Sequence, residues 1–517
     1  MSEKVASPQP ASEAIFQQAF DFLEAGRLED AVARFDMVIA RVPGAAAPYV
    51  CRGDALQLLQ RFEDAIESYD RAIALDGDVP EIYVNRGVAL HSLGKFDAAL
   101  VSTDRAIALD PGYAEAWSNR GNALRKLHRH DEALQSYARA IALRPDFADA
   151  YVNRAGAFEE LDRAAEAIAN FEKALELAPN LLEAKQHLLW GYMQGGSETE
   201  RIARLAGEVA DAGGRTAAAV LRARKTLSDF RIQHDREQAE YLANHGHGFA
   251  GLAEAQSTFA DIQSRHGREI AGKPVAISDK EVDILARFYE HVIRCPLTAS
   301  FGPCLSPAND WAAIEDRYFK SAPEMVVIDD LLSPEAMADL RTFCLASTIW
   351  RKDFQNQYFG TFSEDGFMSP LHLRIAAELQ MKMPRIFGAH RLEQLWAFKY
   401  TSQIGRGINV HADFARVNLN FWITPDDANL DPKSGGMVVY DVPAPAAWGF
   451  DEYNSSSDRI FEFLKENRAG SQTIAYKCNR AVLFNSNLFH ETDAIRFKTG
   501  YENRRINVTY LFGKRFK

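Results

Sequence analysis

The feature that most constrains the fold is a repeat with a period of 34 residues in the N-terminal part of the chain. Aromatic residues mark this period, and each is followed four residues later by a small residue. The pairs are Tyr49 and Gly53, Tyr83 and Gly87, Trp117 and Gly121, and Tyr151 and Ala155. One unit of this length cannot bury its own apolar face, so we expect several units to stack.

The residue types at these positions have a mechanical explanation. Small residues let two helices of one unit approach closely, and the aromatic side chain fills the space between helices. Prolines at Pro111, Pro145 and Pro179 end the second helix of three units. The pattern resembles the tetratricopeptide-repeat family over about residues 12 to 181. The resemblance implies an all-α superhelix of about five repeats, and we assign residues 12–195 to these repeats and a capping helix.

An asparagine stands two positions after the aromatic residue in three units, at Asn85, Asn119 and Asn153. In the tetratricopeptide-repeat family this position faces a concave groove. A carboxamide offers both a donor and an acceptor, so a row of asparagines can bind an extended peptide backbone. We therefore predict that the groove binds a protein or peptide. Assembly of the chain, for example as a homodimer, is the alternative role.

Composition limits the partners and the compartment. The chain has 517 residues, which is too many for one hydrophobic core. Its net charge of −12 argues against binding to a nucleic-acid backbone, and we expect no nucleic-acid partner. The N-terminus lacks the pattern of a secretory signal, and no apolar run is long enough to span a membrane. Five scattered cysteines without a CxxC pair favour a cytoplasmic location.

The remaining chain divides into two parts that differ in their predicted secondary structure. Residues 196–322 have helical character without a repeat, and we interpret them as a helical linker region. Residues 323–517 contain many short β-rich segments with turn signals, which suggests a sandwich or jelly roll with flanking helices. The expected strands include Leu395–Thr401, Ile408–Asp413, Val417–Ile423, Gly436–Tyr440, Gln472–Lys477, Arg480–Asn485 and Arg505–Phe512.

Potential metal ligands occur at two places in this C-terminal part. His411 and Asp413 are two residues apart in an expected strand, so both side chains point to the same face. His490 follows an apolar strand and a tight polar turn. Two histidines and one carboxylate that leave metal positions open are typical of non-haem Fe(II) oxygenases. The three residues together therefore predict a metal centre.

The order of these residues resembles the 2-oxoglutarate/Fe(II) dioxygenase superfamily, close to its prolyl-hydroxylase-like branch. The resemblance implies a double-stranded β-helix, the jelly-roll fold of that family. It also implies Fe(II), bound by His411, Asp413 and His490, with 2-oxoglutarate as cosubstrate and O2 as oxidant. Arg505 follows the distal histidine at the family's spacing and is expected to pair with the far carboxylate of 2-oxoglutarate, and Tyr400 is a further candidate to bind that group.

The expected cosubstrate site includes neighbours of Arg505 on the last strand. Arg504 competes with Arg505 for the carboxylate, and strand alternation favours Arg505 because Asn507 and Thr509 share its face. Asn507 stands where the family commonly has serine, and we include it among the cosubstrate-binding residues. The loop Ala444–Ser457 is either part of a substrate lid or an ordinary insertion with buried aromatic side chains.

Three functions are compatible with this sequence. The first is a 2-oxoglutarate-dependent dioxygenase that hydroxylates a protein or peptide recruited by the repeats. The second is an oxygenase for a small molecule, with the repeats used for assembly. The third is a non-catalytic interaction protein, against which the complete set of His411, Asp413, His490 and Arg505 argues.

Overall fold

A computed structural model describes most of the chain, in two compact units. The described residues are 10–195, 199–266, 274–294, 302–354, 357–401, 403–404 and 407–515. The first unit is Met1–Ala184 and the second is Lys185–Lys517. None of the described helices has the length and apolar character that crossing a lipid bilayer requires.

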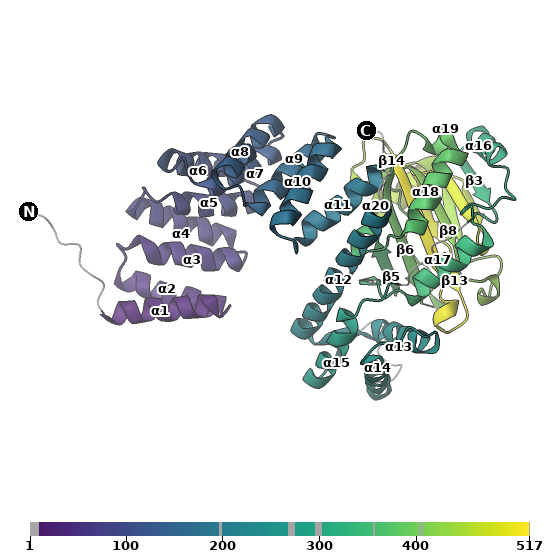
Figure 1. The fold of residues 1–517 in the computed structure, drawn as a ribbon, viewed down its shortest axis with the longest axis horizontal. Helices are drawn as coiled ribbons and strands as arrows, with labels where there is room; N and C mark the ends of the chain where they lie inside the picture. The colour runs from purple at the N-terminus through teal and green to yellow at the C-terminus, as the bar shows by residue number, and fades with distance from the viewer. Residues whose placement is uncertain are drawn as a thin grey trace, which may run out of the picture. The chain divides into compact units, whose positions relative to one another are not determined.

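The first unit consists of successive helix pairs (Figure 1). The pairs are α1 (Pro10–Glu24) and α2 (Leu28–Arg41), α3 (Ala46–Leu58) and α4 (Phe62–Leu75), α5 (Pro80–Ser92) and α6 (Phe96–Leu109), α7 (Ala114–Lys126) and α8 (His130–Leu143), and α9 (Ala148–Glu160) and α10 (Ala164–Leu177). The next helix, α11 (Leu182–Gly195), crosses the boundary between the two units. The predicted all-α superhelix of repeats is confirmed.

In the repeats that contain Gly53 and Gly121, the glycine and the tyrosine 16 positions later meet directly. A Cβ atom added at Gly53 would lie 2.5 Å from Cε1 of Tyr69, and one added at Gly121 would lie 2.5 Å from Cε1 of Tyr137. Both tyrosines are fully buried, and each hydroxyl donates to a side chain of the neighbouring helix. The glycines therefore leave the volume that the tyrosine rings fill.

The second unit combines helices with short strands. Its further helices are α12 (Thr199–Arg224), α13 (Asp229–Asn244), α14 (Leu252–His266), α15 (Asp279–Glu290), α16 (Trp311–Lys320), α17 (Pro334–Ala346), α18 (Pro370–Lys382), α19 (Pro384–Phe387), α20 (Phe450–Asn454) and α21 (Ser457–Glu466). Its strands are β1 (Thr226–Ser228), β2 (Pro274–Ala276), β3 (Met325–Ile328), β4 (Lys352–Phe354), β5 (Tyr358–Phe362), β6 (Leu392–Tyr400), β7 (Gln403–Ile404), β8 (Ala415–Trp422), β9 (Met437–Pro443), β10 (Ser471–Ile474), β11 (Ala481–Asn485), β12 (Leu488–Thr492), β13 (Ile495–Arg496) and β14 (Ile506–Lys514).

Two antiparallel sheets organise this unit. The larger sheet has seven strands in the order β3-β11-β8-β14-β6-β5-β4, and the smaller has three strands in the order β10-β9-β12. This architecture is consistent with the expected jelly roll without being specific to it. The expected strand over Ile408–Asp413 is reduced to one bridge, in which His411 pairs with His490. Backbone hydrogen bonds from Thr492 to Ile408 and from Asp413 to Ser486 also hold this segment.

The two faces of the larger sheet have different environments. Tyr510 of β14 lies on the outer face, where its ring contacts His372 of α18, and His372 in turn contacts Phe343 of α17. Helices α17 and α18 cover this face (Figure 1). Residues Asn507 and Thr509 alternate with Tyr510 and therefore point to the inner face, where both line a cavity.

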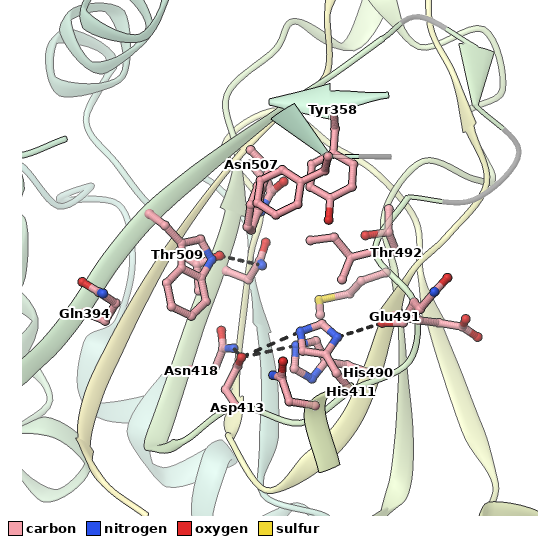
Figure 2. A pocket seen from close by; sticks show the side chains of 18 of the residues that line it. Tyr358, Gln394, His411, Asp413, Asn418, His490, Glu491, Thr492, Asn507 and Thr509 are labelled. Atoms are coloured by element: carbon pink, nitrogen blue, oxygen red, sulfur yellow. Dashed lines mark hydrogen bonds and ion pairs between the residues drawn. The ribbon is translucent and has the colours of Figure 1, made fainter. Parts of the chain in front are cut away.

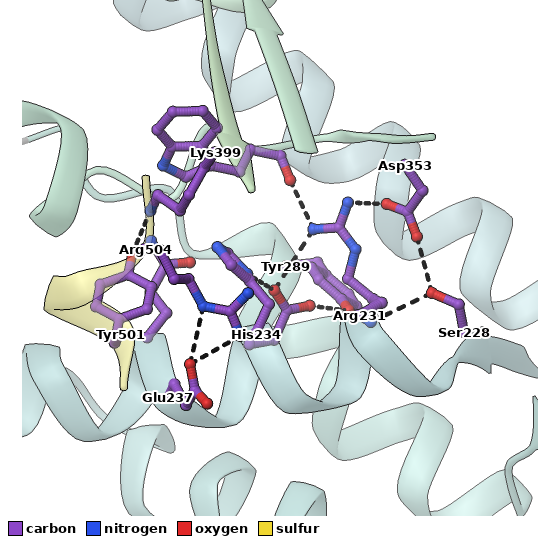
Figure 3. A network of polar contacts seen from close by, with 12 residues as sticks. Ser228, Arg231, His234, Glu237, Tyr289, Asp353, Lys399, Tyr501 and Arg504 are labelled. Atoms are coloured by element: carbon purple, nitrogen blue, oxygen red, sulfur yellow. Dashed lines mark hydrogen bonds and ion pairs between the residues drawn. The ribbon is translucent and has the colours of Figure 1, made fainter. Parts of the chain in front are cut away.

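A buried network of charged and aromatic side chains joins α13 to the outer face of the sheet (Figure 3). The guanidinium of Arg504, which is 2% exposed, binds the carboxylate of Glu237 on α13 at 2.8 Å. The ammonium of Lys399 on β6 donates to the hydroxyl of Tyr501 at 2.8 Å and lies 4.3 Å from the ring centroid of Trp350. Burial is the largest cause that lowers the pKa of Lys399.

A second part of this network involves Arg231 on α13. Its guanidinium pairs with the carboxylate of Asp353 on β4 and donates to the backbone carbonyl of Trp350 at 2.6 Å. Asp235, one turn further along α13, accepts from the hydroxyl of Tyr289 at 2.6 Å. These contacts bind a helix from the middle of the chain into the same unit as the sheet.

The middle of the chain therefore packs as part of the second unit. The sequence indicated a helical linker region over residues 196–322, between the repeats and residues 323–517, and it did not show that this region shares one compact unit with the latter. The difference has a physical reason. The contacts that attach this region are ion pairs between residues more than 100 positions apart, such as Arg504 and Glu237, and they leave no local pattern in the sequence.

We predict that Gly121→Ala destabilises the repeats, although alanine is the better helix former by about 1 kcal/mol. The added methyl group meets the buried ring of Tyr137, and overpacking of this kind costs about 1–3 kcal/mol. The control is Gly44→Ala, because nothing lies within 4 Å of a Cβ atom at Gly44. Thermal unfolding of the full chain, followed by circular dichroism, should show a midpoint lowered by roughly 2–8 °C for Gly121→Ala alone. An equal or higher midpoint would contradict the packing argument.

Candidate metal centre

Two backbone hydrogen bonds bring the two histidines together. The amide of His411 donates to the carbonyl of His490 at 3.0 Å, and the amide of His490 donates back to His411 at 2.8 Å. Directly paired residues of antiparallel strands present their side chains on the same face. The ring centroids of the two histidines are accordingly 4.3 Å apart.

Asp413 completes the cluster (Figure 2). One carboxylate oxygen lies 3.7 Å from Nε2 of His411, and the other lies 3.4 Å from Nε2 of His490. One ligand atom from each of the three residues can be chosen so that all lie within 4.8 Å of one another. Asp413 and His490 are 3% and 4% exposed, so these polar groups are largely removed from water. A buried cluster of this composition is suited to a divalent metal ion.

Backbone carbonyls fix the orientation of both imidazoles. Nδ1 of His411 is 2.8 Å from the carbonyl of Asn409, and Nδ1 of His490 is 3.1 Å from the carbonyl of Leu488. A ring nitrogen beside a carbonyl must carry the proton, so Nε2 of each ring is left with its lone pair toward the cluster. Such contacts orient histidine ligands at metal sites in general.

Burial and the neighbouring groups set the charge state of the cluster. Burial, assisted by His490, lowers the pKa of His411 to about 4, so this imidazole is neutral at neutral pH. Burial alone would raise the pKa of Asp413, but hydrogen bonds and charge from His490, together with His411 and Asn418, lower it. The cluster therefore offers a neutral His411 and an ionised carboxylate, which are the forms that bind metal.

The segment after β9 packs against the back of the segment that carries His411 and Asp413. Val410 and Ala412 alternate with His411 and Asp413, and they belong to an apolar cluster with Tyr453, Ile460 and Leu464. The amide of Ala412 also donates to the carbonyl of Tyr453 at 2.8 Å. The loop Ala444–Ser457 thus supports the segment that carries His411 and Asp413. Phe450 and Asn454 within this loop also line the cavity. Whether it moves as a lid stays a prediction.

The cluster opens onto a cavity of about 510 Å³. Arg505 lines this cavity together with the metal cluster and Asn507. Its guanidinium donates to the backbone carbonyls of Gly435 and Gly436 at 2.6 and 3.0 Å, and to Oδ1 of Asn507 at 3.3 Å. Arg505 is 2% exposed.

The environment of Arg505 suits an anionic ligand. None of the ion pairs among the described residues involves Arg505. Its direct contacts are carbonyl oxygens and aromatic rings, and the carboxylate of Asp493 acts on it only from a distance. Its Cζ lies 4.8 Å from the ring centroid of Tyr400 and 5.7 Å from that of Trp422. Burial lowers the pKa of Arg505, which expresses the same cost of an unpaired buried cation. A carboxylate would remove that cost.

The other residues predicted from the sequence occupy different places. Arg504 points to the outer face of the sheet and pairs with Glu237, so it does not compete for a ligand in the cavity. Tyr400 is fully buried behind Arg505, with its hydroxyl 3.5 Å from Oγ1 of Thr492. Asn507 contacts Arg505 directly.

The asparagines of the predicted groove are half-buried on α5, α7 and α9. The carboxamide of Asn85 donates to Asp54 at 2.9 Å, and that of Asn153 lies 3.4 Å from Oγ of Ser118. These contacts hold two of the side chains against the preceding repeat. Peptide binding by Asn85, Asn119 and Asn153 stays a prediction.

The cavity contains residues that sequence reasoning did not assign. Asn418 is fully buried beside Asp413, and its side-chain amide donates to Oδ2 of that carboxylate at 2.5 Å. Aromatic side chains from β4, β5 and β6 form another part of the lining. Strand alternation identifies such residues once the register is known, but the sequence alone does not give the register.

Comparison with known proteins identifies the first unit. Models of the tetratricopeptide repeat match residues 80–113, 114–147 and 148–181, and a TPR repeat model matches residues 53–94. Residues 53–181 are tetratricopeptide repeats. Repeats of this family typically bind peptides or proteins, so this part of the chain is capable of protein interaction. No curated protein matches the chain.

Solved structures resemble the chain over about a third of its length. MamA is 28% identical, with 31% of this chain and 93% of MamA covered and a TM-score of 0.29. YrrB, described as a TPR protein with an unusual peptide-binding site, is 21% identical, with 34% and 97% covered and a TM-score of 0.29. A thermophilic TPR protein of Thermus thermophilus is 21% identical, with 35% and 99% covered and a TM-score of 0.32.

We predict that the cluster binds one divalent metal ion and that each of its three residues is required. Titration of the full chain with Mn²⁺ in a calorimeter should give one site, and His411→Ala or Asp413→Asn should weaken it at least about 100-fold. Removing even a residue that only orients a metal ligand commonly costs 10–100-fold in affinity. The control is His266→Ala, because His266 lies at the end of α14 and outside the cluster. Unchanged affinity in a folded His411→Ala variant would contradict the site.

Proposed function

We propose that the second unit is a jelly-roll dioxygenase dependent on Fe(II) and 2-oxoglutarate, and that it hydroxylates a protein or peptide recruited by the repeats. The observation that carries this proposal is the convergence of His411, Asp413 and His490 at one end of a cavity that also contains the buried Arg505. A candidate metal site and a candidate site for a carboxylate therefore line one cavity.

The donor set fits a ferrous ion. Two imidazole nitrogens and one carboxylate oxygen are the ligands of the facial triad, which leaves metal positions open for other ligands. Bound Fe(II), with 2-oxoglutarate and O2 as co-reactants, supplies the oxidising chemistry that converts a C–H bond of the substrate into C–OH. The protein contributes the geometry of the site and its exclusion of water.

Each polar residue of the site then has a definite task. The backbone contacts of Nδ1 keep Nε2 of both imidazoles aimed at the metal position. Asn418 donates to Oδ2 of Asp413 and so fixes the rotation of that carboxylate. Arg505 is held by three acceptors in a position to bind the far carboxylate of 2-oxoglutarate.

The repeats support a macromolecular substrate over a small one. They belong to a family that typically binds peptides or proteins, and they are joined in one chain to the candidate metal centre. A peptide held by the repeats would raise the local concentration of substrate near the second unit. An oxygenase for a small molecule and a non-catalytic interaction protein remain the competing functions, and activity measurements separate them.

The test of the proposed function is formation of succinate from 2-oxoglutarate by the full chain with Fe(II), with and without candidate peptides. Turnover that peptides stimulate supports the protein or peptide hydroxylase. Turnover that only small molecules stimulate supports the second function. No turnover with either, and no binding of metal, would support the non-catalytic protein.

We predict that Arg505→Met raises the KM for 2-oxoglutarate by roughly 10–100-fold, because a charge-assisted hydrogen bond to a carboxylate contributes about 1.5–3 kcal/mol. Binding of Mn²⁺ should stay within about threefold of the unmodified protein, since Arg505 is not a metal ligand. The matched control is Arg416→Met, because Arg416 pairs with Glu324 and does not line the cavity. An unchanged KM in the Arg505 variant would remove Arg505 from the cosubstrate site.

A further inference from the structure

One side of the cavity is a continuous wall of aromatic rings. Phe354 and Tyr358 stack with their ring centroids 4.6 Å apart. Phe398 meets Phe354 edge to face at 5.8 Å, and it meets Phe362 edge to face at 5.9 Å. Trp396 continues the wall at 6.0 Å from Phe362. All five rings line the same cavity as the metal cluster.

A glycine at the centre of the wall explains why the rings lie so close together. A Cβ atom at Gly360 would lie 2.8 Å from Phe354, 3.1 Å from Phe362 and 3.1 Å from Phe398. The rings therefore pack over the bare backbone of β5, and their mutual contacts limit the motion of each ring. Apolar rings that face an open cavity are a surface on which a planar apolar group can stack.

The charged residues of the cavity each have another partner or task. Glu364 pairs with Lys352 at 3.6 Å, and the Lys352 ammonium lies 4.1 Å from the ring centroid of Phe362. Glu491 accepts from the hydroxyl of Tyr440 at 2.8 Å. Asp413 belongs to the cluster with His411 and His490, and Arg505 donates to the carbonyls of Gly435 and Gly436. Among the described residues that line the cavity, every charged side chain thus already has a partner or a place in the metal cluster. None is left beside the aromatic wall to select an ionic substrate.

One buried acceptor in the cavity lacks a partner. The side-chain nitrogen of Asn418 must face Asp413, because a carboxylate only accepts hydrogen bonds. The carbonyl oxygen Oδ1 of Asn418 is then left without any hydrogen-bond partner among the described residues, although the side chain is fully buried. Asn418 lines the cavity beside the metal ligands, as Figure 2 shows. An unpaired buried acceptor costs free energy that a donor on a ligand would recover.

We infer that the part of the substrate that enters this cavity is an uncharged aromatic ring carrying one N–H or O–H donor, such as an indole or a phenol. The ring stacks on the aromatic wall, and its donor binds Oδ1 of Asn418. Because the nitrogen of the same carboxamide binds Asp413, this contact brings the ring close to the metal ligands. The inference rests on the proposed function and deepens it by naming the substrate class.

The test compares two probes of the same shape. Indole has an N–H donor, and benzofuran has an oxygen that only accepts. Both are titrated into the full chain loaded with Mn²⁺ and 2-oxoglutarate, and binding is followed by calorimetry or ligand-observed NMR. We expect saturable binding of both, with indole at least 10-fold tighter, because a site that hydrogen-bonds a donor discriminates strongly against an analogue without one. Phenol and fluorobenzene repeat the comparison with an O–H donor.

Variants assign the preference to particular residues. Asn418→Ala should bring the affinities for indole and benzofuran within about twofold of each other, because the acceptor is gone. Trp396→Ala should weaken both probes by a similar factor, because it removes part of the wall. The control is Met381→Ala, because Met381 on α18 is 69% exposed and does not line the cavity. Circular dichroism checks the fold of each variant. The comparison of phenol with fluorobenzene uses the unmodified chain, so it does not depend on a variant that folds.

The outcomes separate this inference from the proposed function. Binding of Mn²⁺ and of 2-oxoglutarate is measured first, and failure of both overturns the proposed function. Intact binding of both, with no saturable binding of indole, overturns only the ring inference. Equal affinity for indole and benzofuran overturns it as well, and so does tighter binding of tryptamine or indole-3-acetate than of indole. The probes are also titrated without metal. The preference for indole over benzofuran is therefore tested whether or not the chain binds Mn²⁺.

The source of the ring is decided by one more comparison. A glycine-rich pentapeptide with a central tryptophan presents the ring on a polypeptide, whereas free indole presents it as a small molecule. Tighter binding of the pentapeptide supports a protein side chain as the substrate group. Tighter binding of indole supports a small aromatic substrate. It would then favour an oxygenase for a small molecule over a protein or peptide hydroxylase.

Discussion

The candidate centre depends on one local interaction, the reciprocal pair of backbone hydrogen bonds between His411 and His490. These residues are far apart in the sequence, and His490 is the central residue of β12. The pair sets the position of both imidazoles before any metal is considered. Asp413 then needs only the alternation of an extended chain to reach the same face. Further backbone hydrogen bonds, from Asp413 to Ser486 and from Ala412 to Tyr453, hold the same segment in place.

Much of the fold could be predicted because it is encoded locally. The helices of the first unit follow from positions such as Trp117 and Gly121, which recur with the period of the repeat. The metal cluster could be predicted as a set of residues, since His411 and Asp413 are near neighbours and His490 follows an apolar strand. What the sequence could not supply was the register of the larger sheet, in which Thr509 pairs with both Trp396 and Asn420. The aromatic wall and Asn418 depend on that register.

The buried charged contacts on the outer face of the larger sheet could not be predicted from the sequence, for a different reason. Lys399 and Arg504 are charged residues, yet both are buried. Their partners come from α13 and from the loop before β14, so only the tertiary structure reveals the pairing. Breaking such a pair leaves a buried charge without compensation, which is strongly destabilising. The strands that carry Phe398, Tyr400 and Arg505 toward the cavity are therefore anchored from behind by the network in Figure 3.

The contact between a small residue and an aromatic residue in repeats such as that of Gly121 and Tyr137 also has a genetic consequence. Gly121 and Tyr137 lie in one 34-residue unit, as do Ala155 and Phe171. A duplication or deletion of a whole unit keeps both partners together, so copy number can change while every interior stays filled. An unequal crossover between the two positions would instead join a unit that carries Ala155 to one that carries Tyr137. The methyl group would then occupy the volume that the tyrosine ring requires, since a Cβ atom at Gly121 already approaches that ring to 2.5 Å.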